Sequence, residues 1–462
     1  MERLVVIGGD AAGMSAASQA RRRRGSDDLD IVAFERGEYT SYAACGLPYY
    51  VSGDIVDADR LIARTPEAHR ANAIDVRTRH EVVAIDLDRR IVRVRDVRSD
   101  IERAERFDQL VIATGAAPIR PDLPGIDLDG VHGVHTVPDA LRIERDIVGA
   151  AGSAAERPGS ARRRRAVVVG GGYVGLEMAE ALLTRGYEVT LVHRGHQPMP
   201  TLDDDMGARV ATAMRELGIT VVVDTEVVGF TAGADGRVGA VDTSNGVLPA
   251  EVVVLGIGVR PNSGLAATAG LEVGRSGGIT VDDRLATSVP GVWAAGDCIE
   301  TLHRVSGEAV AIGLGTHANK QGRVVGINVT GGHARFPGVI GTAITKVCDI
   351  EIARTGLSVS ECERLGIDAV AATIEGTTRA GYYPGAAPIA VKTIAERSTG
   401  RTLGAQIVGG VGAGKRIDAA AVAIWNAMTI DALINVDLAY APPFSPVWDP
   451  LLIAARKTAD RL

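Results

Sequence analysis

The 462-residue sequence contains few cysteines, and those it has lie far apart. Cys45, Cys298, Cys348 and Cys362 form no CxxC pair and no other spacing typical of metal ligands, which argues against a zinc site. Four cysteines in a chain of this length also argue against a disulfide framework. We therefore expect no metal site and a location in the reducing cytoplasm.

Long apolar runs and an excess of positive charge are also missing. No stretch approaches the roughly 20 apolar residues that a membrane-spanning helix needs, and no signal-peptide pattern precedes the predicted strand Leu4–Ile7. The net charge of −7 argues against non-specific binding to nucleic acid. Two arginine runs, 21–24 and 162–165, depart from this acidic average, and the simplest interpretation of each is a solvated face. We expect no nucleic-acid partner and no membrane partner.

Glycine is abundant, and it marks a pattern that occurs twice. The apolar strand Leu4–Ile7 leads into Gly8–Gly13 and a helical stretch, and the strand Ala166–Val169 leads into Gly170–Gly175 in the same way. A glycine turn between a strand and a helix lets the backbone approach a pyrophosphate, whose charge the helix N-terminus stabilises. Length and an apolar share of 46% fit an α/β enzyme of about three domains. Two such units predict two nucleotide-binding domains.

The first glycine turn departs from the usual pattern at one position. Gly8 and Gly13 are present, but Asp10 replaces the usual middle glycine, which crowds a bound phosphate. Glu35 supports the nucleotide assignment, because it ends the second strand of the unit, where an acid can bind a ribose diol. The alternatives are a purely structural turn and, for Glu35, a solvated acid at a strand end.

The second glycine turn is complete, with Gly170, Gly172 and Gly175. Its second strand ends in His193 and Arg194 instead of an acid. An acid would repel a 2′-phosphate, whereas this pair would attract one. The pattern therefore favours NADPH over NADH, with an ordinary surface pair as the alternative.

After each glycine turn, the chain has further predicted strands that are followed by glycine. Thr114 and Gly115 follow one strand, Gly258 closes the second unit, and Asp297 follows a third strand and Gly296. An acid in the place of Asp297 is suited to hydrogen-bonding the ribityl chain of a flavin. The segment 149–165, rich in Gly, Ala, Ser, Pro and Arg, is predicted to be a loop that leads into the second unit.

The order of these features resembles the pyridine nucleotide–disulfide oxidoreductase superfamily. The resemblance implies FAD on the first unit, NAD(P)H on the second and a C-terminal dimerisation domain of a homodimer. The expected fold is α/β, with two Rossmann-like dinucleotide-binding domains plus a C-terminal α+β domain. We place the FAD-binding domain at 1–118 and 286–330, the NAD(P)H-binding domain at 119–285 and the dimerisation domain at 331–462.

Cys45 identifies the branch of this superfamily that the chain resembles. The segment Ser41–Tyr49 is similar to that of the single-cysteine members, which include coenzyme A disulfide reductase, persulfide reductases, NADH oxidase and NADH peroxidase. Members like glutathione reductase carry a CxxxxC pair instead, and no cysteine lies at that spacing from Cys45. Cys298, Cys348 and Cys362 are expected to be buried or incidental thiols.

The resemblance to coenzyme A disulfide reductases is closer than that to the oxidases and peroxidases. Those enzymes carry a histidine in the first turn, where this chain has Ala11, so a group that supplies a proton to a peroxide is missing. Coenzyme A disulfide reductases carry Gln and Arg where this chain has Gln19 and Arg22, which implies that these bind coenzyme A. Ser41 is assigned to the same substrate site. Ala44 departs from the asparagine of many relatives, which leaves substrate preference open.

Two tyrosines complete the predicted site. In this family two tyrosines of the partner subunit lie near the cysteine sulfur, and Tyr382 and Tyr440 match their motifs. A phenol can donate a hydrogen bond to a thiolate or protonate a departing one. The alternative is that both tyrosines only pack at a dimer seam.

These residues predict a flavoenzyme that reduces coenzyme A disulfide, or a coenzyme A persulfide or polysulfide. Electrons pass from NADPH (or NADH) through FAD to a mixed disulfide between Cys45 and coenzyme A, and the Cys45 thiolate then attacks the next substrate. The alternatives are an NADH oxidase that forms a Cys45 sulfenic acid and a flavoprotein without enzymatic activity.

Overall fold

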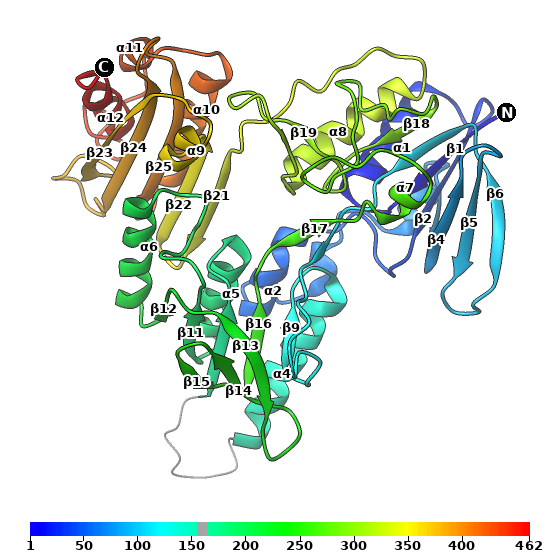
Figure 1. Ribbon diagram of the computed structural model, residues 1–462, viewed down its shortest axis with the longest axis horizontal. Coiled ribbons are helices and arrows are strands. Elements are labelled where there is room, and N and C mark those ends of the chain that lie inside the picture. Colours follow the sequence, from blue (N-terminus) through cyan, green and yellow to red (C-terminus); the bar gives the residue numbers. More distant parts are fainter. Residues whose placement is uncertain (155–163) are drawn as a thin grey trace. The chain divides into compact units, whose positions relative to one another are not determined.

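A computed structural model describes residues 1–154 and 164–462 of the chain. These residues form two compact units, each assembled from several segments. Unit 1 contains Met1–Leu47, Asp57–Ile119 and Val259–Val339, and unit 2 contains Pro48–Val56, Arg120–Gly258 and Ile340–Leu462. Each unit has a five-stranded parallel sheet with helices packed on it (Figure 1), and unit 2 also holds the C-terminal α+β segment. The predicted fold class is confirmed.

The parallel sheet of unit 1 brings the first glycine turn and Glu35 to one edge. Its three central strands, β7, β1 and β2, are rich in Val, Ile and Leu and mostly buried, as in other covered parallel sheets. Ile7 pairs in register with Phe34 on one side and with Ile112 on the other. The strand order is β18-β7-β1-β2-β3, with β1 Glu2–Ile7, β2 Leu29–Glu35, β3 Asp75–Thr78, β7 Gln109–Ile112 and β18 Val292–Ala294.

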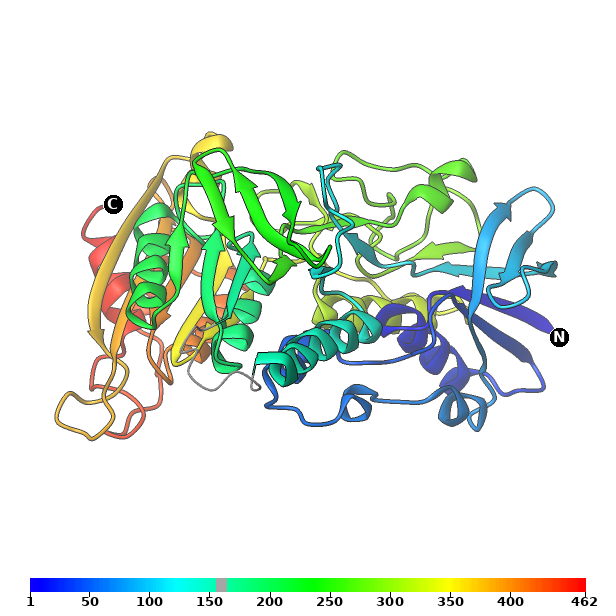
Figure 2. The ribbon, with the colours of Figure 1, turned by 90° about the horizontal axis from the view of Figure 1, so that it is seen from below.

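Helix α1 (Ala11–Arg23) lies along helix α8 (Gly315–Asn328), as Figures 1 and 2 show. Glycine makes this close approach possible, because a Cβ at Gly322 or Gly326 would overlap the backbone of α1. The remaining elements of unit 1 are short: α3 Pro66–Arg70, α7 Gly264–Thr268, β8 Ala116–Pro118, β17 Val259–Pro261, β19 Thr301–Leu302, β20 Ala309–Val310 and the 3₁₀ turns Ala44–Gly46 and Ala58–Leu61.

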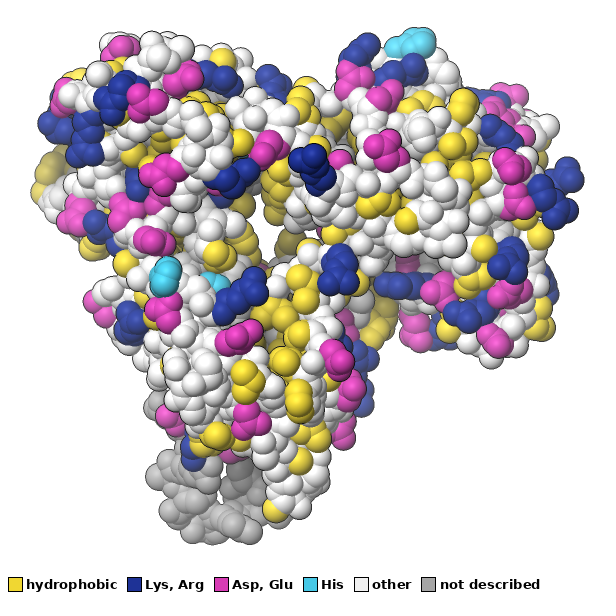
Figure 3. Space-filling model, viewed as in Figure 1, with side chains coloured by type: hydrophobic (Ala, Val, Ile, Leu, Met, Phe, Trp, Pro, Cys, Tyr) yellow, Lys and Arg dark blue, Asp and Glu magenta, His cyan; other side chains and the backbone are white. Residues whose placement is uncertain are grey.

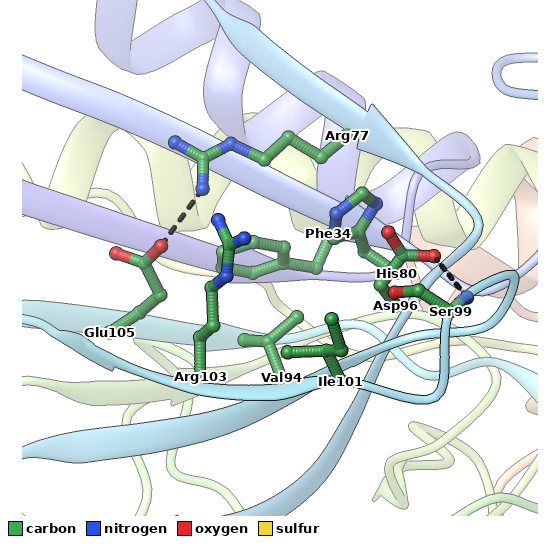
Figure 4. A pocket seen from close by; sticks show the side chains of 9 residues that line it. All are labelled: Phe34, Arg77, His80, Val94, Asp96, Ser99, Ile101, Arg103 and Glu105. Atoms are coloured by element: carbon green, nitrogen blue, oxygen red, sulfur yellow. Dashed lines mark hydrogen bonds and ion pairs between the residues drawn. The ribbon is translucent and has the colours of Figure 1, made fainter.

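An antiparallel sheet packs beside the parallel sheet of unit 1 and encloses a small pocket (Figure 4). The sheet consists of β4 His80–Asp86, β5 Ile91–Asp96 and β6 Glu102–Arg106. Arg77 projects beside this pocket, but its guanidinium is already held by Asp75 and Glu105, both at 2.8 Å. A volume of about 70 Å³ is too small for a dinucleotide. This pocket is therefore not a candidate for the nucleotide site.

Unit 2 repeats the strand, turn and helix arrangement. β10 pairs in parallel with β11 and β16, and helix α5 follows the second glycine turn. The strand order is β12-β11-β10-β16-β9, with β9 Val131–Gly133, β10 Arg165–Val169, β11 Glu188–Val192, β12 Thr220–Val222 and β16 Val252–Leu255. The other elements here are α2 Leu47–Ser52 (which starts at the last residue of a unit 1 segment), α4 Val137–Ala154, α5 Tyr173–Thr184, α6 Asp204–Glu216, β13 Val227–Ala232, β14 Val238–Thr243 and β15 Gly246–Pro249.

The predicted loop at 149–165 is wrong at both ends. Helix α4 continues to Ala154, because alanine favours a helix enough to outweigh the glycines in this stretch. At the other end Arg165 already belongs to β10. Arg164 packs its guanidinium over the Tyr187 ring, 4.4 Å from the ring centre, and donates a hydrogen bond to the Ile147 carbonyl. The rest of the loop, and the first two arginines of the 162–165 run, lie outside the described residues.

The C-terminal segment of unit 2 is an antiparallel sheet with helices, as predicted for an α+β domain. The sheet order is β21-β22-β25-β24-β23. The bounds are β21 Ala343–Val347, β22 Ile350–Gly356, β23 Ala369–Thr377, β24 Pro388–Glu396, β25 Thr402–Gly409, α9 Val359–Arg364, α10 Ile417–Trp425, α11 Ile430–Ile434 and α12 Pro450–Ala459. Residues 259–285, placed in the NAD(P)H-binding domain from sequence, group with unit 1 in the structure. The predicted division into three domains stays a prediction.

A buried ion-pair network joins the start of α6 to β24 and β25 within unit 2. Lys392 Nζ lies 2.9 Å from Asp203 Oδ2 and 2.7 Å from Asp205 Oδ1. Gln406 Nε2 donates to the same Asp203 oxygen at 2.8 Å, and Gln406 Oε1 accepts from the Asp203 backbone N–H. The Lys392 side chain is 10% exposed and that of Asp203 8%, so this pair is largely shielded from solvent, whereas Asp205 is 47% exposed.

We predict that Lys392→Met strongly destabilises unit 2. Removing Lys392 leaves the buried Asp203 carboxylate with hydrogen-bond donors but without an opposite charge, and breaking a buried pair in this way costs about 3–5 kcal/mol. The matched control is Lys457→Met, because Lys457 pairs with Asp460 in an ion pair that is more than half exposed on both sides, and exposed pairs contribute about 0–1 kcal/mol. Urea denaturation of both variants checks this, and equal shifts of the midpoint would contradict the prediction.

Candidate functional site

The first glycine turn has the close contacts that a nucleotide-binding turn requires. Gly8 has a φ of +112°, and a Cβ there would overlap the carbonyl of Ala113. A Cβ at Gly13 would overlap the carbonyl of Gly8, so only glycine lets α1 start directly above the end of β1. The backbone N–H groups at the start of α1 therefore lie at the carboxyl edge of the sheet, where an anion can reach them.

Glu35 is fixed at the end of β2 by the backbone of this turn. Its Oε2 accepts from the Gly9 N–H at 2.8 Å, and its Oε1 accepts from the Gly37 N–H at 2.7 Å. Because both oxygens are acceptors here, the carboxylate is held in one orientation beside the turn. This arrangement matches the acid that binds a ribose diol in dinucleotide-binding units.

Asp10 is the N-cap residue of α1, and its carboxyl group lacks hydrogen bonds that a buried carboxylate needs. It makes no capping hydrogen bond, and its buried Oδ1 has no hydrogen-bond partner among the described residues. Burial, and then the charges of Glu35 and Asp297, raise its pKa to about 6. Sequence reasoning treated Asp10 only as a crowding residue and did not foresee this environment.

The other predicted cofactor residues of unit 1, Thr114, Gly115 and Asp297, come from segments far apart in sequence, and all of them lie near the Cys298 side chain. Thr114 and Gly115 are held by Asn262: its Nδ2 donates to the Thr114 carbonyl at 2.8 Å, and its backbone carbonyl accepts from Thr114 Oγ1 at 2.7 Å. Asp297 follows Gly296, which packs against the start of α1. Asn262 was missed, because no motif links it to a residue 148 positions earlier.

The loop that carries Cys45 is bound to the first glycine turn. The Ser41 N–H donates to the Gly9 carbonyl at 3.0 Å, and Ser41 itself has a φ of +49°. Cys45 lies four residues further on, in the 3₁₀ turn Ala44–Gly46, and is exposed. The structure thus carries an exposed sulfur on a loop fixed to the proposed nucleotide turn.

Ser41 has a second partner that sequence reasoning missed. Its Oγ lies 3.0 Å from Nε2 of His69, a buried residue of α3. Burial and the nearby Arg64 lower the pKa of His69 to about 4, so its imidazole is neutral near pH 7. His69 therefore orients the Ser41 hydroxyl without adding a charge to the site.

The predicted substrate residues of α1 differ in their surroundings. Gln19 is half-buried where α1 contacts Gly326 of α8. In the arginine run, Arg21 bonds to carbonyls, Arg23 to Thr330 and Arg24 to Glu2. Arg22 is exposed and has no hydrogen bond or ion pair with the part of the chain that the structure describes. It is the cation of this run that a phosphate could bind most readily.

The second glycine turn repeats the geometry of the first. A Cβ at Gly170 (φ +105°) would overlap the Gly256 carbonyl, and one at Gly175 would overlap the Gly170 carbonyl. Gly172, in contrast, borders open space, which leaves room for a ligand to approach the backbone. Gly258, with a φ of +102°, follows the neighbouring strand β16.

His193 takes the place in unit 2 that Glu35 takes in unit 1. Its Nδ1 accepts from the Gly171 N–H at 3.2 Å, as Glu35 accepts from Gly9. Burial and then the charge of Arg194 lower the pKa of His193, so the ring accepts this bond in its neutral form. A pocket of about 380 Å³ begins beside it and is lined by His193, Gly195, His196, Gln197, Met199, Pro200, Leu202, Asp203, Asp204, Asp205, Val359, Ser360 and Lys392.

Tyr382 and Tyr440 lie next to each other on unit 2 and face solvent. Tyr382 is 79% exposed and Tyr440 48%. The pKa of Tyr440 is raised, first by partial loss of solvation and then by its hydrogen bond with Tyr382. The structure therefore brings together two phenols that are 58 positions apart in sequence and leaves them available to a partner.

Arg416 ties together the two loops that carry these tyrosines, and it was missed from sequence. Its Nη2 donates to the carbonyl of Thr378 in one loop and, at 2.8 Å, to the carbonyl of Phe444 in the other. Its Nε pairs with Asp449 Oδ2 at 2.9 Å, and both side chains are nearly buried. One cation thus fixes the relative position of the two tyrosine loops.

The other three cysteines are poor candidates for a redox role. Burial raises the pKa of Cys298 and raises that of Cys362 to about 12, and both side chains are fully buried. Burial also raises the pKa of the half-buried Cys348. Because the thiolate is the nucleophile, these groups react slowly at neutral pH.

The described residues contain no group of three or more His, Cys, Asp or Glu side chains that could hold a metal ion. Among the described helices, none is both long and apolar enough to cross a membrane. On the face drawn in Figure 3, Lys and Arg side chains are mixed with Asp and Glu side chains over the described residues.

Comparison with protein families identifies the chain. The model described as "Pyridine nucleotide-disulphide oxidoreductase" matches residues 2–322, and the model of the dimerisation domain of the same family matches residues 342–450. The chain belongs to the pyridine nucleotide-disulphide oxidoreductases. The resemblance inferred from the two glycine turns is thereby confirmed.

Relatives within this family act on different acceptors. An "NAD(P)H sulfur oxidoreductase (CoA-dependent)" of Pyrococcus abyssi is 39% identical over 98% of this chain and 97% of its own. An "NADH oxidase" of Methanocaldococcus jannaschii is 36% identical over 100% of this chain and 99% of its own. The solved structure of an NAD-dependent persulfide reductase from A. fulgidus has a TM-score of 0.92 at 39% identity, covering 99% of this chain and 83% of that one.

We predict that His193→Asp weakens the use of NADPH relative to NADH by this oxidoreductase. Asp places an acceptor oxygen where Nδ1 now accepts from Gly171, but adds a negative charge that repels a 2′-phosphate. The ratio of kcat/KM for NADPH to that for NADH should fall by about tenfold or more, about 1.4 kcal/mol, in steady-state assays with both nucleotides.

Two variants control for this change. His193→Asn keeps a neutral acceptor and should keep the original ratio. His196→Asp introduces the same charge at a side chain that is 82% exposed and lines the same pocket. If His196→Asp lowered the ratio as much as His193→Asp, the change would be a general effect of negative charge in the pocket and not a specific effect of position 193.

Proposed function

We propose that this protein is an FAD-dependent NAD(P)H:disulfide oxidoreductase that reduces coenzyme A disulfide or a coenzyme A persulfide through Cys45. The observation that carries the proposal is the exposed Cys45 on a loop whose Ser41 N–H bonds to Gly9 of the first nucleotide turn. The relatives named as a CoA-dependent sulfur oxidoreductase and a persulfide reductase support this substrate class.

Unit 1 has residues that fit FAD. The glycines at positions 8 and 13 leave a cradle that a Cβ would fill, Glu35 presents a fixed carboxylate for a ribose diol, and Asp297 lies near the start of α1 for the ribityl chain. Thr114 and Gly115 complete this side of the site. FAD, when bound, supplies the two-electron link between the nicotinamide and sulfur.

Unit 2 has residues that fit NADPH. Gly170, Gly172 and Gly175 form the second turn, and a neutral His193 with Arg194 leaves its ribose edge without an acid. We infer a preference for NADPH, with NADH as a second donor. The relatives' names do not single out one nucleotide, since one is called an NAD(P)H sulfur oxidoreductase and another an NAD-dependent persulfide reductase.

The reaction of Cys45 follows from thiol–disulfide exchange. Its thiolate attacks one sulfur of coenzyme A disulfide, the second coenzyme A leaves as a thiolate, and a mixed disulfide between Cys45 and coenzyme A remains. Two electrons from NADPH then break the mixed disulfide, releasing coenzyme A and restoring the Cys45 thiolate. With a coenzyme A persulfide as the substrate, Cys45 attacks the sulfur attached to coenzyme A, hydrosulfide leaves, and the same mixed disulfide forms.

Tyr382 and Tyr440 act on the sulfur of the partner subunit in this proposal. A phenol can donate a proton to a leaving thiolate or a hydrogen bond to the resting one. Their exposure and the match of the dimerisation domain over 342–450 support a homodimer in which each subunit completes the other's site. Arg416 holds both loops in position for this role.

Gln19, Arg22 and Ser41 form the proposed coenzyme A site. Arg22 has no partner among the described residues and can form charge-assisted hydrogen bonds to the nucleotide phosphates. Ser41, oriented by His69, presents a hydroxyl near the loop of Cys45. A location in the cytoplasm, where coenzyme A thiols are kept reduced, stays a prediction.

An NADH oxidase is the second candidate, because a relative with that name is 36% identical over the whole chain. In that case Cys45 cycles through a sulfenic acid and the acceptor is oxygen. Ala11 argues against it, because no histidine is present there to protonate a peroxide. The two functions are distinguished by measuring NADPH oxidation with and without oxygen, each with and without coenzyme A disulfide. A rate of oxygen consumption that does not change when the disulfide is added would establish the oxidase.

We predict that Cys45→Ser abolishes coenzyme A disulfide reduction while NADPH still bleaches the flavin absorbance anaerobically. The wild-type protein, purified without reductant, should carry a coenzyme A adduct on Cys45 that dithiothreitol removes, as measured by mass spectrometry. Cys348→Ser is the control, since its half-buried thiol has a raised pKa, and it should retain both activity and adduct. Disulfide reduction that survives in Cys45→Ser would refute the mechanism.

We predict that Arg22→Gln raises the KM for coenzyme A disulfide about tenfold, which matches the loss of one hydrogen bond to a charged group, about 1.5 kcal/mol. The KM for 4,4′-dithiodipyridine, a disulfide without phosphates, should stay unchanged. Arg23→Gln is the matched control, because Arg23 already bonds to Thr330. An equal rise for both disulfides would assign Arg22 to the stability of α1 instead of substrate recognition.

A further inference from the structure

The Asp10 carboxyl group occupies a position in which a negative charge is poorly stabilised. It is the N-cap of α1, with φ −115° and ψ −156°, yet its side chain makes no capping hydrogen bond. Its Oδ1 is buried without a hydrogen-bond partner among the described residues. An ionised carboxylate offers only acceptors, so a buried oxygen left unpaired carries the full cost of desolvation.

Two other carboxyl groups surround Asp10. Glu35 reaches it from the end of β2, and Asp297 from the segment after β18, and both disfavour a negative charge on Asp10. The backbone groups of Tyr42 and Ala11 act in the opposite direction but do not outweigh burial, so the pKa lies near 6. Helix α8, packed along α1, carries His317 and Lys320, and neither is among the causes of this shift.

Binding of a dinucleotide adds more negative charge at this place. A pyrophosphate binds where the backbone N–H groups of the helix N-terminus are exposed, which is the turn that contains Asp10. Additional negative charge nearby disfavours the carboxylate further and favours the protonated form. A protonated carboxyl group carries an O–H and can donate a hydrogen bond, whereas phosphate oxygens can only accept.

We propose that Asp10 binds FAD as a neutral carboxylic acid that donates a hydrogen bond to the cofactor, and that loss of this proton weakens FAD binding. The inference rests on the proposed function for the identity of the cofactor. It explains how an acid replaces the middle glycine of the turn: the residue makes a contact with FAD that glycine cannot make. It also gives the protein a cofactor affinity that depends on pH.

The sign of the pH dependence follows from linkage. The group has a higher pKa with FAD bound than without it, so binding is tightest below about pH 6 and weakens as the pH rises toward the pKa of the bound form. A rise of one unit in the bound form corresponds to a tenfold change in affinity. We expect the FAD dissociation constant of the wild-type protein to be about fivefold higher at pH 8.5 than at pH 6.0, because the free group is already half ionised at pH 6.0.

The test measures the dissociation of FAD from the purified holoprotein by flavin fluorescence between pH 6.0 and 8.5. Asp10→Asn keeps a donor that cannot ionise, so its dissociation constant should not change with pH and should be lower than that of the wild type at pH 8.5. Asp27 is an exposed acid just beyond α1, and Asp27→Asn should keep the wild-type slope, meaning the change of the FAD dissociation constant with pH. Asp10→Gly restores the usual glycine and should lose the slope without gaining affinity at high pH.

The pH dependence of FAD binding in these variants shows which group is responsible for it. A slope that persists in Asp10→Asn belongs to Glu35, Asp297, His317 or another group and overturns the proposal, as does a wild-type protein without any slope. If Asp10→Asn does not fold, the wild-type slope and Asp10→Gly still test it. If neither the wild type nor any variant binds FAD at any pH, the cofactor assignment itself is wrong, a result distinguishable from failure of the Asp10 proposal alone.

Discussion

The close contact between a helix and the turn that precedes it governs both parallel sheets. In each unit the third glycine of the turn lies against the carbonyl of the first, Gly13 on Gly8 and Gly175 on Gly170. A single methyl group at either place would lift the helix away from the strand end. The backbone N–H groups that can bind a pyrophosphate, and the residues that surround them, keep their positions only because this contact is made.

The same scaffold is used twice with one chemical difference. At the end of the second strand each unit places an acceptor for the second N–H of its turn, a carboxylate in Glu35 and a neutral imidazole in His193. The hydrogen bond is common to both, while the charge is not. In the proposed function, selection between nucleotides therefore requires no different fold and no different turn, because it is assigned to the charge of one acceptor and to the neighbouring Arg194.

Much of this organisation could be predicted from sequence, because it depends on local patterns. Glycine turns after apolar strands, an acid at a strand end and a cysteine in a family motif are all read within a few residues of one another. The remaining features arise from contacts between distant segments. Asn262 holds Thr114, His69 holds Ser41, and Arg416 joins two loops. The helical end of α4 at Ala154 was missed because glycine and serine in the segment suggested a loop.

His193 has a further consequence in evolutionary terms. Histidine codons become aspartate codons by exchange of their first base alone, and both residues carry an acceptor atom on Cγ, as Nδ1 of His193 is when it accepts from Gly171. A lineage carrying this turn can therefore move between a neutral and an anionic ribose site in one mutational step, without passing through an intermediate that loses the hydrogen bond. Under the proposed role of His193, nucleotide preference can therefore change while the fold stays the same.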